Sequence, residues 1–387
     1  MKTLRSGRNR RKWIYVLLLM GLLGLSGCGS PSSASVEMSS QTELVKTGSM
    51  ELQYAENFAV DYYEDGYKML TTLPDSKRYL IVPEGQPVPR GLDEDVSILQ
   101  EPLQNIYLVA SGVMDMFASL DAVDQIRFSG QKQENWYIQT AKDAMAAGDM
   151  IYAGKYSKPD YELLVSEGCD LAIENRMITH SPEVVEMLQS FDIPVMIEYS
   201  SYEKHPLGKV EWVKFFGALT GKEAEAEEAF AEQTEILEKV ESGEKTGKTI
   251  AFFYVTSNGL IQVRQSTDYI PKLIELAGGR YIFEDLEDSG SGRSTLNMQV
   301  EDFYAGAKDA DILIYNSSID GGVTTLDELI GKCNILKDFK AVQEGQVYCT
   351  TNDMYQQSMA IGYLLQDMHT VLTDDDTAKL RYLFLLQ

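Results

Sequence analysis

Residues 220–240 have the sequence TGKEAEAEEAFAEQTEILEKV, and this stretch decides the fold. After Gly221 it contains no glycine or proline and is rich in alanine and glutamate, a composition that predicts a strong helix. Thr220 and Glu223 match a capping box and place the helix start. Steps of four and three residues define one inward face, formed by Ala226, Phe230, Gln233, Leu237 and Val240. We therefore expect a rigid helix about 30 Å long.

Short apolar runs alternate with helical patterns on both sides of this helix. Strands are predicted at residues 78–82, 105–110, 170–173 and 194–199 before it, and at 249–255, 311–315 and 346–349 after it. Helices are predicted at residues 181–191, 269–277, 300–306 and 355–372. Strand, helix and strand in succession indicate parallel sheets. The expected fold class is α/β, with two Rossmann-like lobes joined by a single long α-helix.

The domain boundaries follow from this pattern. We expect an N-terminal lobe at residues 51–208, linking helices at 209–245 that include the long helix, and a C-terminal lobe at 246–387. One stiff connector predicts a small closure motion. A loose internal repeat supports two related lobes, because Glu162 precedes DLAIEN at 170–175 and Glu301 precedes DILIYN at 311–316.

The first residues predict export. Six basic residues precede a 13-residue apolar stretch, which is too short to span a bilayer and ends in LSGC at residues 25–28. This ending resembles a bacterial lipobox, which implies cleavage at residues 1–27, lipidation of Cys28 and anchoring at the extracytoplasmic face of the membrane. An uncleaved anchor or a chance cysteine is the alternative. Residues 28–50 are polar and serine-rich, which predicts a flexible tether.

Charge and residue counts exclude several classes of function. Removal of residues 1–27 would change the formal net charge from −25 to −31, which disfavours nucleic-acid binding. Cys169, Cys333 and Cys349 show no metal-ligand spacing, and a Cys333–Cys349 bond is an alternative to three buried thiols. The chain has only three histidines, so a bare metal ion is a poor fit, although His180 or His205 could bind haem iron. We find no hydrolase, zinc-protease or phosphate-loop motif, so no catalysis is expected.

Four segments carry a family resemblance. They are YAGKYSKPDYE at 152–162, EWVKFFG at 211–217, LIELAGG at 273–279 and DFKAVQEGQVY at 338–348. In this order the chain, over residues 78–371, resembles the substrate-binding proteins of ABC importers for ferric siderophores, haem and cobalamin. The resemblance implies a monomer that works with a permease and its ATPase. It also implies that Glu162 and Glu301 dock against the permease, although a carboxylate at a helix start is favoured without any partner.

In such a fold, the loops after the parallel strands face the ligand. Arginine suits the oxygen atoms of an iron chelate, and aromatic rings suit its apolar flanks. The candidate ligand-binding residues are Trp136, Tyr156, Arg176, Tyr199, Tyr202, Arg264, Arg293, Asn316 and Tyr355. The resemblance implies an iron complex as ligand, a ferric siderophore first, with haem or a corrinoid as alternatives and no resident cofactor. An exported enzyme or a sensor lipoprotein on the same fold is the rival class.

Overall fold

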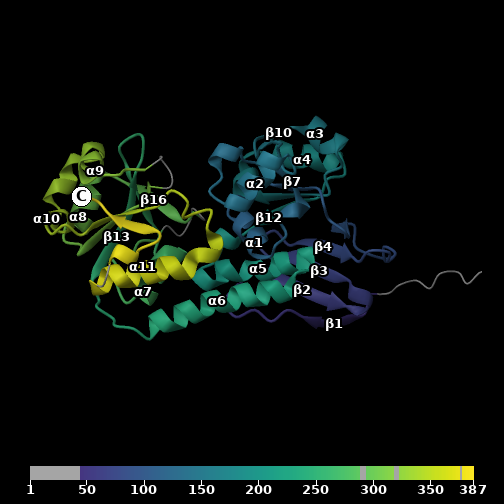
Figure 1. Cartoon of the computed structure of the whole chain (residues 1–387), viewed down its shortest axis with the longest axis horizontal. Helices are drawn as coiled ribbons and strands as arrows, with labels where there is room; N and C mark the ends of the chain where they lie inside the picture. Colours follow the sequence, from purple (N-terminus) through teal and green to yellow (C-terminus); the bar gives the residue numbers. More distant parts are fainter. Residues whose placement is uncertain (1–43, 288–292, 318–321, 375–376) are drawn as a thin grey trace, which may run out of the picture. The chain divides into compact units, whose positions relative to one another are not determined.

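The structure is a computed structural model that describes residues 44–287, 293–317, 322–374 and 377–387 (Figure 1). Cys28, the predicted signal peptide and most of the predicted tether lie outside these residues. The described residues form one compact unit. In the described ranges no helix has the length and apolar character that crossing a membrane requires.

The chain begins with a five-stranded sheet that the sequence did not predict. Its strands are β1 (Lys46–Ser49), β2 (Phe58–Tyr63), β3 (Lys68–Thr72), β4 (Lys77–Val82) and β5 (Val96–Gln100), in this order. All neighbours are antiparallel except β4 and β5. The prediction that the flexible tether extends to residue 50 is therefore wrong, because residues 46–49 form β1 and pair with β2. The predicted strand at 78–82 is β4, which lies in this sheet and not in a parallel lobe sheet.

The N-terminal lobe is built on a fully parallel sheet of order β12-β11-β6-β7-β8. Its strands are β6 (Ile106–Leu108), β7 (Ile126–Ser129), β8 (Ile151–Tyr152), β11 (Leu171–Asn175) and β12 (Val195–Glu198). The helices are α1 (Val113–Ser119), α2 (Gln139–Ala147), α3 (Tyr161–Ser166) and α4 (Pro182–Ser190), and β9 (Gly154–Lys155) pairs with β10 (Lys158–Pro159). Ser181 and Pro182 begin α4 as the sequence predicts.

The C-terminal lobe has a mixed sheet of order β16-β14-β13-β17-β18-β19, with β15 beside β13. Its strands are β13 (Thr249–Val255), β14 (Ile261–Arg264), β15 (Arg280–Tyr281), β16 (Thr295–Met298), β17 (Ile312–Tyr315), β18 (Val347–Thr350) and β19 (Leu383–Leu385). Strands β13, β15, β17 and β18 are parallel to one another, and β14, β16 and β19 are antiparallel to their neighbours. The helices are α7 (Tyr269–Leu276), α8 (Val300–Ala307), α9 (Leu326–Lys332), α10 (Lys340–Gln343) and α11 (Ile361–Thr373).

Two helices connect the lobes. Helix α5 (Pro206–Thr220) ends at Gly221, whose φ of 72° is in the left-handed region, and α6 (Glu223–Glu241) follows directly. The predicted capping box is wrong, because Thr220 is the last residue of α5 and its hydroxyl donates to Phe216 O. Lys222 occupies the N-cap position instead. The predicted inward face of α6 is confirmed, since the five predicted residues are its buried residues.

The linking helices are packed tightly into the core. Helix α6 lies beside α5 and α11 (Figure 1). A Cβ atom on Gly217 of α5 would be 2.6 Å from Cβ of Ala226 in α6, so this close approach requires glycine. One continuous apolar core runs from the first sheet through α5 and into the C-terminal lobe. The linking helices are therefore part of the core that both lobes share.

The segment between β18 and α11 also joins the two lobes. The Gln356 side chain donates to Asn135 O and accepts from the backbone N–H group of Tyr137, at 2.8 Å each. The backbone N–H group of Met359 donates to Asp115 Oδ2 at 2.7 Å. The predicted helix start at residue 355 is wrong, because these contacts hold the segment outside α11, which begins at Ile361.

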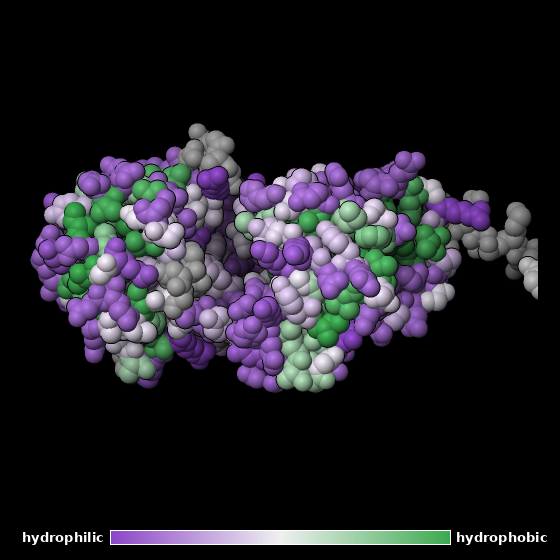
Figure 2. Space-filling view, turned by 90° about the horizontal axis from the view of Figure 1, so that it is seen from above, coloured by the Kyte–Doolittle hydropathy of each residue, from purple (hydrophilic) through white to green (hydrophobic). Residues whose placement is uncertain are grey.

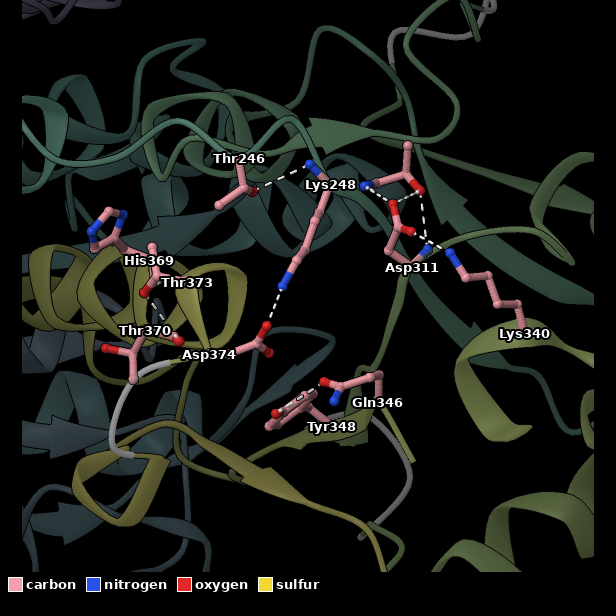
Figure 3. A network of polar contacts seen from close by, with 11 residues as sticks. Thr246, Lys248, Asp311, Lys340, Gln346, Tyr348, His369, Thr370, Thr373 and Asp374 are labelled. Carbon is pink, nitrogen blue, oxygen red and sulfur yellow. Dashed lines mark hydrogen bonds and ion pairs between the residues drawn. The ribbon is translucent and has the colours of Figure 1, made fainter. Parts of the chain in front are cut away.

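An aspartate ties the strand starts together in each lobe. Asp311 Oδ2 accepts from the backbone N–H group and the hydroxyl of Thr249 at 2.7 and 2.8 Å, and Asp311 Oδ1 pairs with Lys340 at 2.6 Å (Figure 3). Asp170 Oδ2 accepts from the backbone N–H groups of Gln104 and Asn105 at 3.0 and 2.9 Å. The same position of the predicted repeat therefore has the same structural role in both lobes.

The surface is mostly hydrophilic. Hydrophilic residues cover most of the face seen in Figure 2, and apolar patches between them are small. Cys333 and Cys349 are buried, Cys169 is partly buried, and the three form no disulfide with one another. The interpretation of these residues as packing thiols is confirmed, and the alternative disulfide between Cys333 and Cys349 is not formed.

Candidate functional site

A cavity of about 270 Å³ lies at the carboxyl ends of the parallel strands of the N-terminal lobe and extends to the C-terminal lobe. The loops after β6, β11 and β12 contribute Ser111, Arg176 and Tyr202 to its lining. Helix α5 contributes Lys209, and the C-terminal lobe contributes Arg264, Tyr269, Ser294 and Tyr355. The position agrees with the general rule that ligands bind beyond the carboxyl ends of parallel strands.

On the C-terminal side, Arg264 is held in one orientation. Its guanidinium group forms a 3.4 Å ion pair with Asp268 and a hydrogen bond with the Tyr355 hydroxyl. Its backbone N–H and C=O groups both bond to the Tyr281 hydroxyl, at 3.0 and 2.8 Å. Asp268 is fixed in turn because it caps α7 through the Ile270 N–H group. The guanidinium group is thus preorganised before any ligand arrives.

Tyr355 offers a hydrogen-bond donor to the cavity. Its oxygen accepts from Arg264 and, at 2.7 Å, from Asn316 Nδ2. Burial raises the pKa of Tyr355 to about 12, so the hydroxyl keeps its proton at neutral pH. With its oxygen engaged by two donors, the hydroxyl group can direct its own proton to an oxygen atom of a ligand.

On the N-terminal side, Arg176 stands at the end of β11. Its guanidinium carbon is 4.6 Å from the centre of the Tyr202 ring, a stacked arrangement that keeps the charge beside the cavity. The preceding residue, Asn175, turns the chain because its side chain accepts from the Met177 N–H group at 2.8 Å. Arg176 and Arg264 thus approach the cavity from different lobes.

Lys209 and Glu198 are the charged residues of the described lining that sequence reasoning missed. Lys209 is only 3% exposed, its ammonium group is 4.8 Å from the Tyr269 ring centre, and burial lowers its pKa. Glu198 Oε2 accepts from the backbone N–H and hydroxyl groups of Ser200 at 2.8 and 2.5 Å, and burial raises the pKa of Glu198. The available signal was a lysine in a helix, α5, whose residues are otherwise mostly apolar.

The structure brings some of the predicted ligand-binding residues together. Arg176, Tyr202, Arg264 and Tyr355 line the cavity, and Asn316 lies directly behind Tyr355. Arg293 lines a neighbouring depression of about 210 Å³ together with Tyr202 and Asp268. The rule that places ligand residues after parallel strands accounts for Arg176, whereas Arg264 is the last residue of the antiparallel strand β14.

Three predicted residues lie elsewhere, so their assignment is corrected. Trp136 is fully buried, and its indole N–H group donates to Ser129 Oγ at 3.0 Å. Tyr199 is 7% exposed and belongs to the main core. Tyr156 packs against the second core of the N-terminal lobe. In each case, the aromatic ring contributes to packing and does not line the cavity.

The charges of the cavity contrast with those of the whole chain. The charged residues in its lining are Arg176, Lys209, Arg264 and Glu198, so the lining carries more positive than negative charge in a protein of net charge −25. Such a site suits an anionic ligand with oxygen acceptors. Over the described ranges, no cluster of three or more metal-ligating side chains occurs. Neither His180 nor His205 lines the cavity.

Residues 108–354 match the family described as periplasmic binding protein. The chain belongs to this family. The first sheet, β1 to β5, precedes the matched residues. Members of the family bind substrates, and the cavity of this periplasmic binding protein lies within the matched region except for Tyr355, which follows it directly.

Two relatives of this periplasmic binding protein are uncharacterized lipoproteins of Methanocaldococcus jannaschii. One is 24% identical over 93% of this chain and 92% of its own length, and the other is 23% identical over 89% and 90%. These matches extend over nearly the whole chain. They therefore reach well beyond the part that defines the family.

Solved structures show the same fold. A substrate-binding protein of an ABC transporter from Listeria monocytogenes is 17% identical, with a TM-score of 0.54 over 70% of this chain and 98% of the other. A periplasmic haem-binding protein of Vibrio cholerae is 15% identical, with a TM-score of 0.55 over 69% and 98%. An Fe³⁺-hydroxamate transport protein of Saccharomonospora viridis is 16% identical, with a TM-score of 0.54 over 70% and 93%.

Proposed function

We propose that this chain is an extracytoplasmic lipoprotein that captures an iron complex, a ferric siderophore first, and delivers it to the permease of an ABC importer. The observation that carries the proposal is the convergence of Arg176 and Arg264, from different lobes, on one cavity. A guanidinium group donates to two oxygen atoms at once and stays charged, which suits the oxygen-rich surface of an iron chelate.

The remaining lining fits the same ligand class. The Tyr202 and Tyr269 rings can cover apolar flanks of a chelate, and Tyr355 can donate a hydrogen bond to one of its oxygens. The printed names of the structural neighbours include Fe³⁺-hydroxamate transport and haem binding, which supports an iron-containing cargo.

The anchor belongs to the proposal as well. The relatives that cover most of the chain are named lipoproteins, which supports lipidation at Cys28. Two acyl chains are enough to keep a protein stably on a membrane. A carrier tethered in this way stays close to the permease that it serves.

Glu162 and Glu301 are the proposed contacts with the permease. Both side chains are exposed, and each lies in the first turn of its helix, α3 or α8. Each helix leads to a strand preceded by the aspartate that ties the strand starts together, Asp170 or Asp311. Two equivalent carboxylates on two related lobes are what a pseudo-symmetric basic partner would require.

Haem is the second candidate, because Tyr355 places a phenol oxygen in the cavity beside Arg264. Tyrosinate can bind ferric haem iron. However, the pKa of about 12 for Tyr355 works against the phenolate form. Neither His180 nor His205, the two histidines considered as haem ligands, lines the cavity. The ferric siderophore therefore remains the leading ligand.

Calorimetric titration of the soluble protein from residue 29 onward tests the proposal. Ferric citrate, a ferric hydroxamate, a ferric catecholate, haem and cobinamide are the probes. We expect submicromolar, saturable binding of a ferric siderophore.

Two variants locate the binding. Arg264→Gln should weaken binding at least tenfold, since a charged hydrogen bond is lost. Arg280→Gln is the matched control, because Arg280 is an exposed arginine of the same lobe that pairs with Glu284. A wild type that binds none of the iron complexes would rule out the proposed function.

A further inference from the structure

We infer that Lys209 is an anchor for a negatively charged oxygen group of the cargo, so that the ligand is a net-anionic, carboxylate-bearing iron chelate. The inference rests on the proposed function and specifies its substrate class. It is carried by the position of Lys209, a buried lysine of the linking helix that faces the cavity and has no ion-pair partner among the residues that the structure describes.

The environment of Lys209 leaves its charge uncompensated. No carboxylate oxygen of the described residues lies within 4.0 Å of its ammonium nitrogen. The Tyr269 ring, 4.8 Å away, compensates only in part. Glu198 is close enough to act on Lys209 electrostatically, but one of its oxygens is held by two hydrogen bonds from Ser200.

Lys214, in the same helix, is a buried lysine whose charge is compensated by ion pairs. It is 4% exposed, and its ammonium nitrogen is 2.9 Å from a Glu227 oxygen and 3.7 Å from a Glu211 oxygen. Buried charges in proteins are normally paired in this way, because an isolated one is costly. Lys209 departs from that rule at the one face of α5 that meets the cavity, so a bound anion is the partner that it lacks.

The charge balance of iron chelates narrows the ligand class. Three hydroxamate groups neutralise Fe³⁺, so such a complex offers no net negative charge to an ammonium group. Carboxylate and catecholate chelates are net anionic. Among the described residues, Arg176, Lys209 and Arg264 at the cavity outnumber the carboxylates Glu198 and Asp268.

Size separates the two anionic classes. The cavity volume of about 270 Å³ is near the lower end for small-molecule sites. A tris-catecholate complex presents three aromatic rings around the metal, whereas a hydroxycarboxylate chelate is compact. We therefore assign the carboxylate class, with one carboxylate reaching Lys209 and further oxygens facing Arg264 and Tyr355.

Lys209→Met is the variant that tests this assignment, and Lys214→Met is its matched control. Without ligand, Lys209→Met should raise the melting temperature by several degrees, because it removes an uncompensated buried charge, whereas Lys214→Met should lower it. In calorimetry, Lys209→Met should weaken ferric citrate binding at least tenfold and leave binding of a ferric hydroxamate within threefold of the wild type. Lys214→Met should bind both as the wild type does.

The outcomes separate this inference from the proposed function. If the wild type binds iron chelates and Lys209→Met binds ferric citrate equally well, the anchor is refuted while the iron-binding function stands. Equal destabilisation of the ligand-free protein by both variants would make Lys209 structural and would also refute the anchor. Citrate without iron allows a second measurement that does not depend on binding of an iron complex. It should raise the melting temperature of the wild type and of Lys214→Met, and it should leave the melting temperature of Lys209→Met unchanged.

Discussion

The carboxylate of Glu211 in α5 accepts a 2.8 Å hydrogen bond from the backbone N–H group of Ala55, 156 residues earlier in the chain. The same carboxylate also accepts from the N–H groups of Gln53 and Tyr54. Glu203, just before α5, accepts from the next two N–H groups at 2.9 and 3.0 Å. Two buried carboxylates thus fasten the segment before β2 to the linking helix.

We expect Glu211→Ala to lower the free energy of unfolding by about 3 kcal/mol or more, because it leaves several buried N–H groups without an acceptor. Urea denaturation of the soluble protein measures the loss. Glu235→Ala, an exposed glutamate of α6, is the control and should change stability by less than about 0.5 kcal/mol. Equal effects of the two substitutions would contradict a structural role for Glu211.

Asp311 gives the C-terminal lobe part of its acid sensitivity. Burial acts to raise the pKa of Asp311, but hydrogen bonds from Lys340 and Thr249 outweigh it and lower the pKa to about 2. The stabilisation is therefore complete above pH ~4 and is lost as the pH falls towards 2. Asp311→Asn should reduce stability at pH 6 by about 1 kcal/mol, a value that allows for solvent screening.

Urea denaturation between pH 2 and 7 checks this expectation. The difference between wild type and Asp311→Asn should shrink towards zero at the acid end. Asp309→Asn, at an exposed aspartate two residues earlier, serves as the control. A difference that is independent of pH would show that the network of Figure 3 does not depend on ionised Asp311.

The sequence predicted the elements that carry a strong periodic pattern. The inward face of α6 and the strands β11, β12, β13 and β17 follow from apolar spacing alone. The strand β1 could not be found in this way, because all four of its residues are exposed and it is held by backbone pairing with β2. The two carboxylates that fasten the first sheet are equally invisible, since their partners are backbone groups.

The candidate site was predicted in part for a similar reason. The topology rule locates Arg176, which follows the parallel strand β11, but it does not account for Arg264, the last residue of the antiparallel strand β14. Lys209 lies in the middle of a helix, and only tertiary packing reveals that one face of this helix forms part of the lining. Trp136 shows the opposite error, in which a residue predicted to bind ligand is buried in the core. Its position in a loop does not show whether the ring points into the core or towards the cavity.

Glu174 in β11 should make the N-terminal lobe less stable as the pH rises. Both carboxyl oxygens are buried without a hydrogen-bond partner within the described residues, and burial raises the pKa of Glu174 to about 8. The folded state therefore keeps the proton that the unfolded chain releases near pH 4.5, and stability falls between pH ~4.5 and ~8. Glu174→Met should raise the free energy of unfolding at pH 7.5 by about 2–4 kcal/mol.

The pH dependence distinguishes this effect from simple repacking. Wild type and Glu174→Met should differ little at pH 4 and increasingly up to pH 8. Glu186→Met, at an exposed position of α4, should keep the slope of the wild type. A variant that is destabilised at every pH would show that Glu174 has a partner in solution.

The docking assignment predicts a separation of transport from binding. The double substitution Glu162→Lys and Glu301→Lys should abolish cellular uptake while ligand affinity stays within twofold of the wild type, because both side chains are exposed and neither lines the cavity. Glu186→Lys with Glu344→Lys makes the same change in net charge at other exposed positions and should leave uptake intact. Normal uptake by the Glu162 and Glu301 variant would refute docking through these residues.

Tyr355 and Gln356 are neighbours in sequence, but their side chains make contacts in different places. The phenol of Tyr355 lines the cavity. The side-chain amide of Gln356 forms hydrogen bonds with the backbone of Asn135 and Tyr137 in the opposite lobe. Only one peptide unit separates the two side chains along the chain. A displacement of the backbone at this point would therefore shift the lining of the cavity and the contact between the lobes together.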